Sequence, residues 1–359
     1  MTLHTLLVGP GAIGGTVATF AAEKGFAFDV LGRPEEAAFL AENDYEISGV
    51  LGEHRARLRV FGGIDELPEA YYDVVLIATK AQSMPFVAQS LLPRLREDSL
   101  VLGLQNGITT ELMAEVVGAQ RTVSCMIGIG ATAQGIGRVE LTSGGHFIIG
   151  QADVQNAALG TGGSLGSPTK PIAGTAIADK LEYLRSFIDA MQPTKISENI
   201  LGELYSKLVF NACINALCAL SGMTLGVLLD DKKARQTFLA IAREGMAVAD
   251  KIGLDVPPFM GLLDYRLIAK HTGAVANALF GKLFQIIGKV RIGKVHPSTL
   301  QSLERGEITE IDYLNGYFLK RGDEVGVACP VNAQIIAMIH EIERGERQMG
   351  LANIAELVL

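Results

Sequence analysis

The fold is decided near the start of the chain, by the run Thr5-Leu6-Leu7-Val8-Gly9-Pro10-Gly11-Ala12-Ile13-Gly14-Gly15. An apolar stretch typical of a strand leads directly into Gly-x-Gly-x-x-Gly, and Ala12–Lys24 then has apolar side chains at helical spacing. In this motif the first glycine makes a tight turn, the second lets the backbone approach a pyrophosphate, and the third lets the helix pack on the strand. The N–H groups that begin the helix favour an anion. The motif therefore predicts a dinucleotide-binding βαβ unit, whose cofactor contacts come from Gly9, Gly11, Ala12, Ile13 and Gly14.

The first part of the chain alternates short apolar runs with helical periodicity, over about 150 residues, which is typical of an α/β fold with a parallel sheet. The expected buried strands are Thr5–Val8, Phe26–Leu31, Val74–Ala78, Leu100–Leu104 and Thr122–Ile127. His54–Val60, with its alternating arginines, is expected as an exposed edge strand. Val139–Thr142 and His146–Gly150 are expected to form a closing hairpin.

Beyond Ile177 long helical periods replace the strand signals. The expected helices are Ala178–Met191, Glu198–Ser221, Lys232–Ile252, Ala274–Ile287, Thr309–Val325 and Val331–Arg344. We therefore predict a Rossmann domain over residues 1–197 and an all-helical domain for substrate binding and dimerisation over 198–359. Residues 157–175 are rich in Gly, Ser and Pro and are interpreted as a surface insertion, with a substrate lid as the alternative.

The composition narrows the classes of function. The 359 residues include 31 basic and 39 acidic side chains, a net charge of −8. Binding of nucleic acid needs clustered Lys and Arg, so nucleic acid is not expected as a partner. The four cysteines lack Cys-x-x-Cys spacing, which predicts neither a disulfide framework nor a metal site. Because the N-terminus has no basic region before its apolar run, we expect a cytoplasmic protein with reduced cysteines.

The end of the second strand bears on the choice of dinucleotide. An NAD enzyme usually has Asp or Glu there, on the ribose 2′-hydroxyl. Here the strand ends in Gly32-Arg33, and a guanidinium can pair with a 2′-phosphate, so NADP is favoured. The alternative is a solvated Arg33, with Glu35 or Glu36 reaching the ribose.

Two further strand ends carry polar residues where ligands of parallel sheets bind. Lys80 follows the strand Val74–Ala78, and Asn106 follows Leu100–Leu104. Because ligands lie beyond the carboxyl ends of such strands, Lys80 and Asn106 are expected towards the nicotinamide half. The alternative for each is a helix-entry or turn residue.

Residues 208–229 carry no charge and are long enough to span a bilayer. However, Lys207, Asn211 and Asn215 recur every four residues and so share one helical face. Such a polar stripe is costly in lipid, which favours a buried helix of a soluble protein and no membrane partner. A lysine at the head of a buried stripe can serve as a general acid, because burial and neighbouring charge bring its pKa towards neutrality. The alternative is a structural pair between Lys207 and Glu203.

A second polar cluster precedes the predicted helix at Thr309. Thr309 is expected as the N-cap, with Asp312 as a capping-box carboxylate. Glu310 then lies in the first turn, where the helix dipole stabilises a carboxylate.

Taken together, these motifs resemble the ketopantoate reductase (2-dehydropantoate 2-reductase) family over nearly the whole chain. The resemblance rests on Gly9–Gly14, Gly32-Arg33, Thr79-Lys80-Ala81, Gln105-Asn106-Gly107, and Lys207, Asn211 and Asn215 combined with Thr309–Gly316. It implies an N-terminal Rossmann domain, a helical C-terminal domain and NADPH-dependent reduction of a 2-oxo acid.

The resemblance also implies a role for each candidate residue. Lys207 matches the catalytic lysine, which donates a proton to the ketone oxygen as hydride reaches C2. Glu310 matches the acid that orients this lysine and holds the substrate's hydroxyl. The implied substrate-binding residues are Asn106, Asn211, Asn215 and Ser298, and the residues implied to select NADPH are Arg33 and Lys80.

The expected reaction is therefore reduction of 2-dehydropantoate to (R)-pantoate, a step of pantothenate biosynthesis. The segment that begins at Ser298 departs from the family's pattern, which usually has Asp where this chain has Ser302. Reduction of another 2-oxo acid or a β-keto acid is therefore the alternative within the class. A non-catalytic NADP-binding sensor is the alternative outside it, although a sensor has no need of both Lys207 and Glu310. The expected partners are a small 2-oxo acid and a second copy of the chain.

Overall fold

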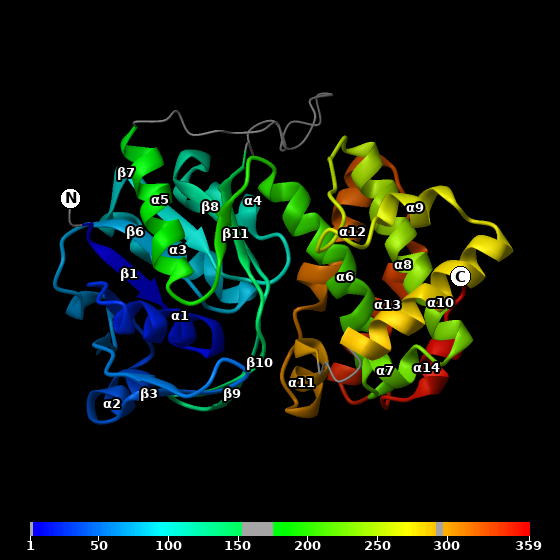
Figure 1. Cartoon of the computed structure of the whole chain (residues 1–359), viewed down its shortest axis with the longest axis horizontal. Helices are drawn as coiled ribbons and strands as arrows, with labels where there is room; N and C mark the ends of the chain where they lie inside the picture. The colour runs from blue at the N-terminus through cyan, green and yellow to red at the C-terminus, as the bar shows by residue number, and fades with distance from the viewer. Residues whose placement is uncertain (1–2, 153–174, 292–296) are drawn as a thin grey trace. The chain divides into compact units, whose positions relative to one another are not determined.

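The computed structural model describes residues 3–152, 175–291 and 297–359. The chain forms two compact units, one ending at Leu201 and one beginning at Gly202 (Figure 1). The insertion predicted at 157–175 lies outside the described residues except for Thr175, whose hydroxyl accepts a hydrogen bond from the Ala178 N–H and caps a helix.

The first unit is built on a sheet of eight strands among the described residues. In order across the sheet they are β12 (Thr194–Ile196), β11 (Phe147–Gln151), β8 (Thr122–Ile127), β7 (Leu95–Gly103), β6 (Tyr72–Ile77), β1 (Thr5–Val8), β2 (Asp29–Leu31) and β5 (Val60–Phe61). All neighbours pair in parallel except β8 and β11, which are antiparallel. The order β5-β2-β1-β6-β7-β8 is that of a doubly wound Rossmann sheet, which confirms the predicted fold class.

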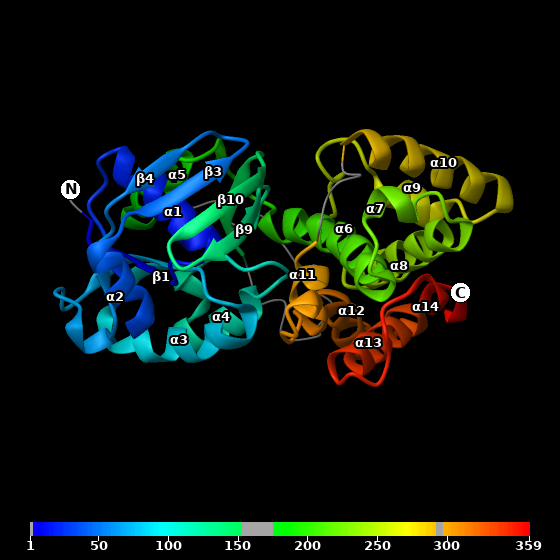
Figure 2. The same ribbon diagram turned by 90° about the horizontal axis from the view of Figure 1, so that it is seen from below.

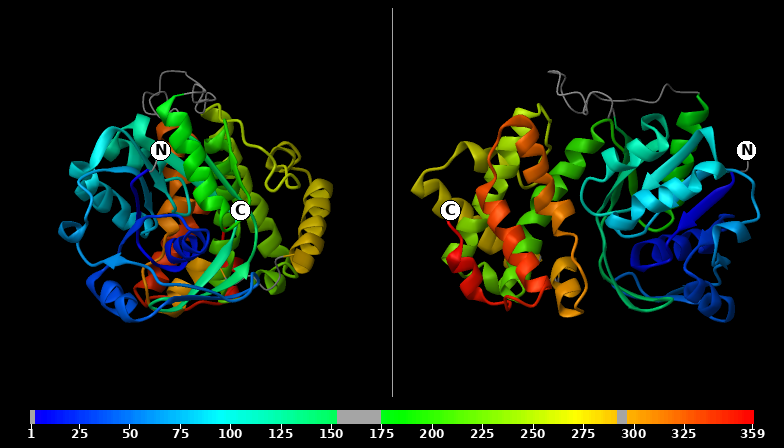
Figure 3. Two further views of the ribbon diagram at one scale, coloured as in Figure 1. Left: turned by 60° about the vertical axis from the view of Figure 1, so that its left-hand side comes forward. Right: turned by 180° about the vertical axis from the view of Figure 1, so that it is seen from behind.

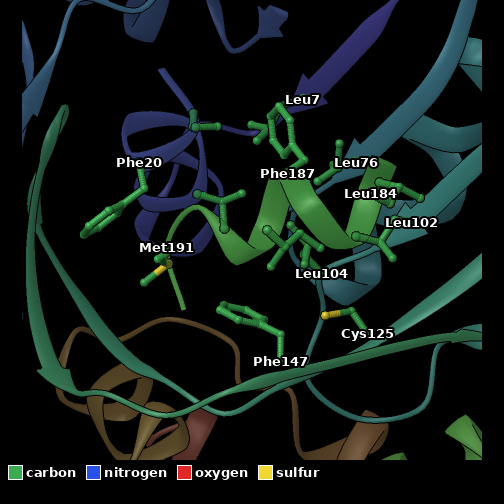
Figure 4. Close-up of a cluster of buried hydrophobic side chains, with 14 of the residues drawn as sticks. Leu7, Phe20, Leu76, Leu102, Leu104, Cys125, Phe147, Leu184, Phe187 and Met191 are labelled. Carbon is green, nitrogen blue, oxygen red and sulfur yellow. The ribbon is translucent and has the colours of Figure 1, made fainter. Parts of the chain in front are cut away.

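Both faces of this sheet are covered, so its strands are apolar on both sides. Helices α1 (Ala12–Glu23) and α5 (Ala176–Asp189) cover the face that carries Leu7, Leu76 and Leu102, as the close-up in Figure 4 shows. Helices α3 (Met84–Leu91) and α4 (Thr110–Val117) cover the other face, which carries Leu6 and Val75. Successive strand residues therefore pack into the two hydrophobic cores on opposite faces of the sheet, because the side chains of a strand alternate between its faces.

A second sheet of four strands lies over α1 (Figure 2). Its order is β4 (His54–Ala56), β3 (Tyr45–Gly49), β10 (Arg138–Ser143) and β9 (Gly130–Gly135). The His54 ring packs on Phe20 of α1 with centroids 4.3 Å apart, and its Nδ1 lies 2.9 Å from Glu23 Oε2. Helix α1 is therefore enclosed between two sheets. Helix α2 (Pro34–Glu42) follows β2, and short 3₁₀ turns occupy Ile64–Glu66, Ala81–Ser83, Leu92–Arg94 and Ala119–Arg121.

Two predictions about strands were wrong, both because of this second sheet. The expected edge strand His54–Val60 is divided: β4 joins the second sheet, whereas β5 joins the main sheet beside β2. The expected hairpin between Val139–Thr142 and His146–Gly150 does not form. Strand β10 pairs with β3 and β9, and β11 pairs with β8 and β12, so the glycines between them carry the chain from one sheet to the other.

The second unit is mostly helical in its described residues, with loops and one isolated β-bridge, between Phe259 and Leu263, connecting the helices. Its helices are α6 (Ile200–Ser221, whose first two residues belong to the first unit), α7 (Leu225–Leu228), α8 (Lys232–Lys251), α9 (Tyr265–Lys270), α10 (Ala274–Arg291), α11 (Ser298–Glu304), α12 (Ile311–Val325), α13 (Pro330–Glu343) and α14 (Leu351–Glu356). Helices α12 and α13 run side by side (Figure 3).

Helix α6 is long and apolar enough to cross a membrane, and 83% of its apolar window is buried inside the protein. Its Tyr205 hydroxyl donates to the Gly245 carbonyl of α8 at 2.6 Å, and the Tyr205 ring packs on Tyr317 and Phe318 of α12. Its apolar surface is thus covered by neighbouring helices. The four cysteines are buried and not bonded to one another, and burial raises the pKa of Cys218 to about 12.

Candidate active site

The glycine motif forms the connection from β1 to α1, and each of its glycines has a distinct structural reason. Gly9 has φ +91°, a conformation that glycine adopts without strain. A Cβ on Gly14 would lie 2.1 Å from the Gly9 carbonyl oxygen and 2.7 Å from Ala78 Cβ, so only glycine lets α1 approach β6. A Cβ on Gly11 would meet open space, which leaves that position accessible to a ligand. The loop therefore has the shape that a bound pyrophosphate needs.

A hydroxyl beside this loop has no partner among the described residues. Thr79 Oγ1 is buried and makes no hydrogen bond, and a Cβ on Gly9 would lie 3.2 Å from Thr79 Cγ2. A buried hydroxyl without a hydrogen-bond partner destabilises the fold unless a ligand or a water molecule supplies the missing hydrogen bond. An orphaned hydroxyl next to an open glycine cradle fits a bound dinucleotide.

Arg33 precedes α2 and already has two carboxylate partners. Its guanidinium lies 3.0 Å from Glu35 Oε1 and donates to Glu36 Oε1 at 2.9 Å, and its backbone N–H donates to Glu36 Oε2 at 2.8 Å. The hydrogen bond that Arg33 donates to Glu36, and then the charges of Glu36 and Glu35, raise the pKa of Arg33. In the structure both carboxylates pair with Arg33. The alternative prediction, that Glu35 or Glu36 reaches the ribose instead, stays open.

Lys80 and Asn106 follow β6 and β7, which are adjacent parallel strands, so both lie at the same edge of the sheet. Lys80 is exposed and precedes a 3₁₀ turn, whose Ser83 N–H donates to the Lys80 carbonyl at 3.0 Å. Asn106 is half-buried. Their neighbour Gln105 was not predicted as a site residue, but its Nε2 donates to the carbonyls of Ile77 and Thr79 at 2.7 and 3.1 Å. Gln105 thereby holds the ends of the two strands together.

The helical unit carries the remaining candidates. Lys207, Asn211 and Asn215 lie on successive turns of α6, and the first two are half-buried while 7% of Asn215 is exposed. Helix α12 packs on α6, where Asn315 Nδ2 donates to the Ala212 carbonyl at 3.2 Å. Glu310 immediately precedes α12, so both candidate catalytic residues come from helices that touch each other.

The start of α12 differs from the prediction. Its N-cap is Glu310 rather than Thr309, although the Thr309 hydroxyl accepts a hydrogen bond from the Ile311 N–H at 3.2 Å. Asp312 does not cap the helix, because its Oδ2 lies 3.2 Å from His340 Nε2 on α13. Glu310 is half-buried at the start of α12, and the Asp312 carboxylate contacts α13.

Ser298 and Ser302 both belong to one short helix, α11, four residues apart. Ser298 is its first residue and is exposed, whereas 6% of Ser302 is exposed. The serine that stands where the family usually has Asp is therefore the buried one. Within the described ranges no group of three metal-ligating side chains is found.

Two phenylalanines beside the polar stripe were missed by the sequence analysis. Phe210 of α6 stacks on Phe259, with ring centroids 4.4 Å apart and 24° between the ring planes, and both are half-buried. Phe210 lies three residues after Lys207, so the two side chains are neighbours on the helix surface. Phe259 opens a tight turn, in which Met260 has φ +53° and is 62% exposed. No local pattern could have paired residues so far apart in the sequence.

Comparison with known proteins agrees with both units. The model of the ketopantoate reductase PanE/ApbA family matches residues 5–153, and the model of the C-terminal part of the same family matches residues 199–343. The chain belongs to the ketopantoate reductase family. It is accordingly a dinucleotide-binding oxidoreductase that acts on CH–OH donors, and the predicted family and enzyme class are confirmed.

Individual relatives and similar solved structures are distant from this chain in sequence. The 2-dehydropantoate 2-reductase of Aquifex aeolicus is 23% identical over 344 residues, which cover 94% of this chain and 96% of that protein. A D-mandelate dehydrogenase, solved with NADH and anilino(oxo)acetate, shares the fold with a TM-score of 0.75 at 20% identity, over 95% of this chain and 98% of that one. A dimeric ketopantoate reductase from Staphylococcus aureus has a TM-score of 0.69 at 17% identity, over 96% of this chain and 100% of that one.

Proposed function

We propose that the chain catalyses the NADPH-dependent reduction of a 2-oxo acid to a 2-hydroxy acid, with 2-dehydropantoate as the substrate and (R)-pantoate as the product, in pantothenate biosynthesis. The observation that carries the proposal is the stripe Lys207, Asn211 and Asn215 on α6, a mostly buried helix of a ketopantoate reductase family member. The Rossmann unit, residues 1–197, binds the cofactor, and residues 198–359 supply most of the substrate site.

When it is bound, the nicotinamide supplies the hydride that reaches C2. Reduction makes an alkoxide, so cationic and amide donors should converge on the carbonyl oxygen. Lys207 Nζ donates a hydrogen bond to that oxygen and then transfers its proton to it. Glu310 orients Lys207 and accepts a hydrogen bond from the substrate's hydroxyl. The amides of Asn106, Asn211 and Asn215 and the hydroxyl of Ser298 bind the rest of the substrate.

The preference for NADPH rests on Arg33 and Lys80, the cationic side chains next to the ends of β2 and β6. A guanidinium pairs with a phosphate through two parallel hydrogen bonds, which gives it both strength and direction. In the structure Glu35 and Glu36 hold that guanidinium, so the 2′-phosphate must compete with a carboxylate for it.

A second candidate is reduction of a 2-oxo acid with a larger apolar group. The stacked rings of Phe210 and Phe259 favour it, because they present apolar surface one helical turn from Lys207. A flat apolar substituent on the substrate gains both burial and ring stacking there.

We also propose a cytoplasmic homodimer that forms through the helical unit. Val275 and Leu279 are four residues apart on α10, and 84% and 68% of their surfaces are exposed. Apolar side chains at this spacing lie together on one helix face, and burial against a second copy would remove them from water.

The test is NADPH oxidation by the purified protein against 2-dehydropantoate, small aliphatic and aromatic 2-oxo acids, and a β-keto acid. Lys207→Ala should lower kcat by about 10²–10⁴, the usual contribution of a general acid, with NADPH affinity unchanged. The matched control is Lys251→Ala, which removes an exposed lysine of α8. Full kcat in Lys207→Ala would show that Lys207 is not the proton donor. NADPH binding without turnover of any of these acids would favour a non-catalytic NADP-binding sensor.

A further inference from the structure

The glycine loop is held by a tyrosine from the second sheet. Tyr45, the first residue of β3, donates a hydrogen bond from its hydroxyl to the Gly11 carbonyl at 2.7 Å. Only 1% of the Tyr45 surface is exposed. Burial, and then the nearby charge of Glu36, raise the pKa of this hydroxyl, so it remains a hydrogen-bond donor throughout the neutral range. The contact joins the second sheet directly to the middle glycine of the dinucleotide motif.

Gly15, the residue after the motif, leaves room for the Tyr45 side chain because it has no Cβ. A Cβ on Gly15 would lie 2.1 and 2.2 Å from two Tyr45 ring carbons and 2.3 Å from the Tyr45 hydroxyl oxygen, nearer than any real contact. Gly14, one residue earlier, faces Gly9 and Ala78 instead. The two successive glycines therefore allow α1 to pack closely on both sides. Gly14 allows the approach to the main sheet, and Gly15 leaves room for the Tyr45 side chain of the second sheet.

The hydrogen bond fixes one particular peptide group. The Gly11 carbonyl accepts both the Tyr45 hydroxyl and the Gly15 N–H, the latter at 2.8 Å. In a planar trans peptide the carbonyl and the following N–H point in opposite directions. A carbonyl held by Tyr45 therefore aims the Ala12 N–H away from Tyr45, and this N–H is among the first donors of α1.

We propose that Tyr45 is a positioning residue for the dinucleotide: its hydroxyl holds the Gly11–Ala12 peptide in the orientation that presents the Ala12 N–H to the pyrophosphate. The role depends on the cofactor binding in the proposed function. It is independent of Lys207 and of the identity of the oxo acid. Because the pyrophosphate is common to NADH and NADPH, Tyr45 affects both cofactors equally.

The test compares Tyr45→Phe with Tyr72→Phe, since each removes one hydroxyl from a tyrosine that is 99% buried. The Tyr72 hydroxyl donates to Asp29 Oδ2 at 2.8 Å, where β2 begins and β6 begins, at the opposite end of the sheet from the glycine loop. Dissociation constants for NADPH and NADH are measured by titration calorimetry, with the melting temperature of each variant recorded with and without cofactor. KM for NADPH and kcat are measured in parallel.

Tyr45→Phe should weaken NADPH and NADH by about the same factor, roughly tenfold, which is the loss expected for about 1.4 kcal/mol. KM should rise with kcat unchanged, and the cofactor should raise the melting temperature less than in wild type. Tyr72→Phe should bind both cofactors as wild type does. Wild-type affinity in Tyr45→Phe, or equal losses in the two variants, would overturn the role of Tyr45. A wild-type chain that bound neither nicotinamide cofactor would overturn the proposed function and this inference together.

Discussion

The Glu36 carboxylate accepts two hydrogen bonds from Arg33, one from Nη2 at 2.9 Å and one from the backbone N–H at 2.8 Å. The side chain of Glu36 is 13% exposed and that of Arg33 is 67% exposed. Glu36 also lies next to Gly32, where a Cβ would be 3.1 Å from its Oε2. A mostly buried negative charge therefore lies beside the guanidinium that is proposed to bind the 2′-phosphate. We expect this charge to weaken the proposed preference for NADPH over NADH.

Glu36→Gln should raise the ratio of kcat/KM with NADPH to kcat/KM with NADH about fivefold, because it removes repulsion of the 2′-phosphate worth about 1 kcal/mol. Arg33→Ala should lower the same ratio. Glu35→Gln is the control with the smaller effect, since 53% of the Glu35 side chain is exposed and solvent screens its charge. A change of equal size with NADH would show that Glu36 acts on the fold of α2 rather than on the phosphate.

Phe259→Ala should lower kcat/KM for an aromatic 2-oxo acid by about tenfold and leave that for a small aliphatic one within about twofold, because it removes half of the stacked pair beside Lys207. The comparison variant is Phe86→Ala, which removes an 80% exposed phenylalanine of the first unit. Equal losses for both acids would place the pair outside the substrate site.

Asn332→Ala should lower the free energy of unfolding by about 2–4 kcal/mol in a urea titration. Asn315 Nδ2 donates to Asn332 Oδ1 at 2.7 Å, and Asn332 Nδ2 donates to the Glu244 carboxylate at 2.6 Å, with both asparagines fully buried. Glu244 also accepts the Val331 N–H and so caps α13. The exposed Lys320 of α12 provides the control variant Lys320→Ala, and an equal effect there would contradict the role of the network.

Asp98→Asn should lower the melting temperature at neutral pH, and its difference from wild type should vanish on acidification. Lys180 Nζ, almost fully buried, donates to Asp98 Oδ2 at 2.8 Å, and this hydrogen bond holds the pKa of Asp98 below its ordinary value. A depressed carboxyl pKa stabilises the folded state above the unfolded pKa, about 3.9, and the contribution is lost as the pH falls through the lower folded pKa. Asp65→Asn, at an exposed position, is the control. A difference that persisted in strong acid would assign the effect to packing.

Much of the first unit follows from local sequence. Thr5–Val8, the glycines at 9, 11 and 14 and the helical period after them determine a βαβ unit, because each requirement lies within a few residues. The helical character of the second unit and the shared face of Lys207 and Asn211 follow in the same way from a period of 3.6.

Strand pairings and side-chain contacts between segments that are far apart in the chain were decided only by the tertiary structure. The second sheet pairs β3 with β10, and nothing within either segment specifies the other, so the division of His54–Val60 and the separation of β10 from β11 were not predictable. For the same reason the packing of the Tyr45 ring against Gly15 needed the folded chain. The sequence by itself determined a Rossmann unit and a polar stripe; packing between segments far apart in the chain decided what surrounds them.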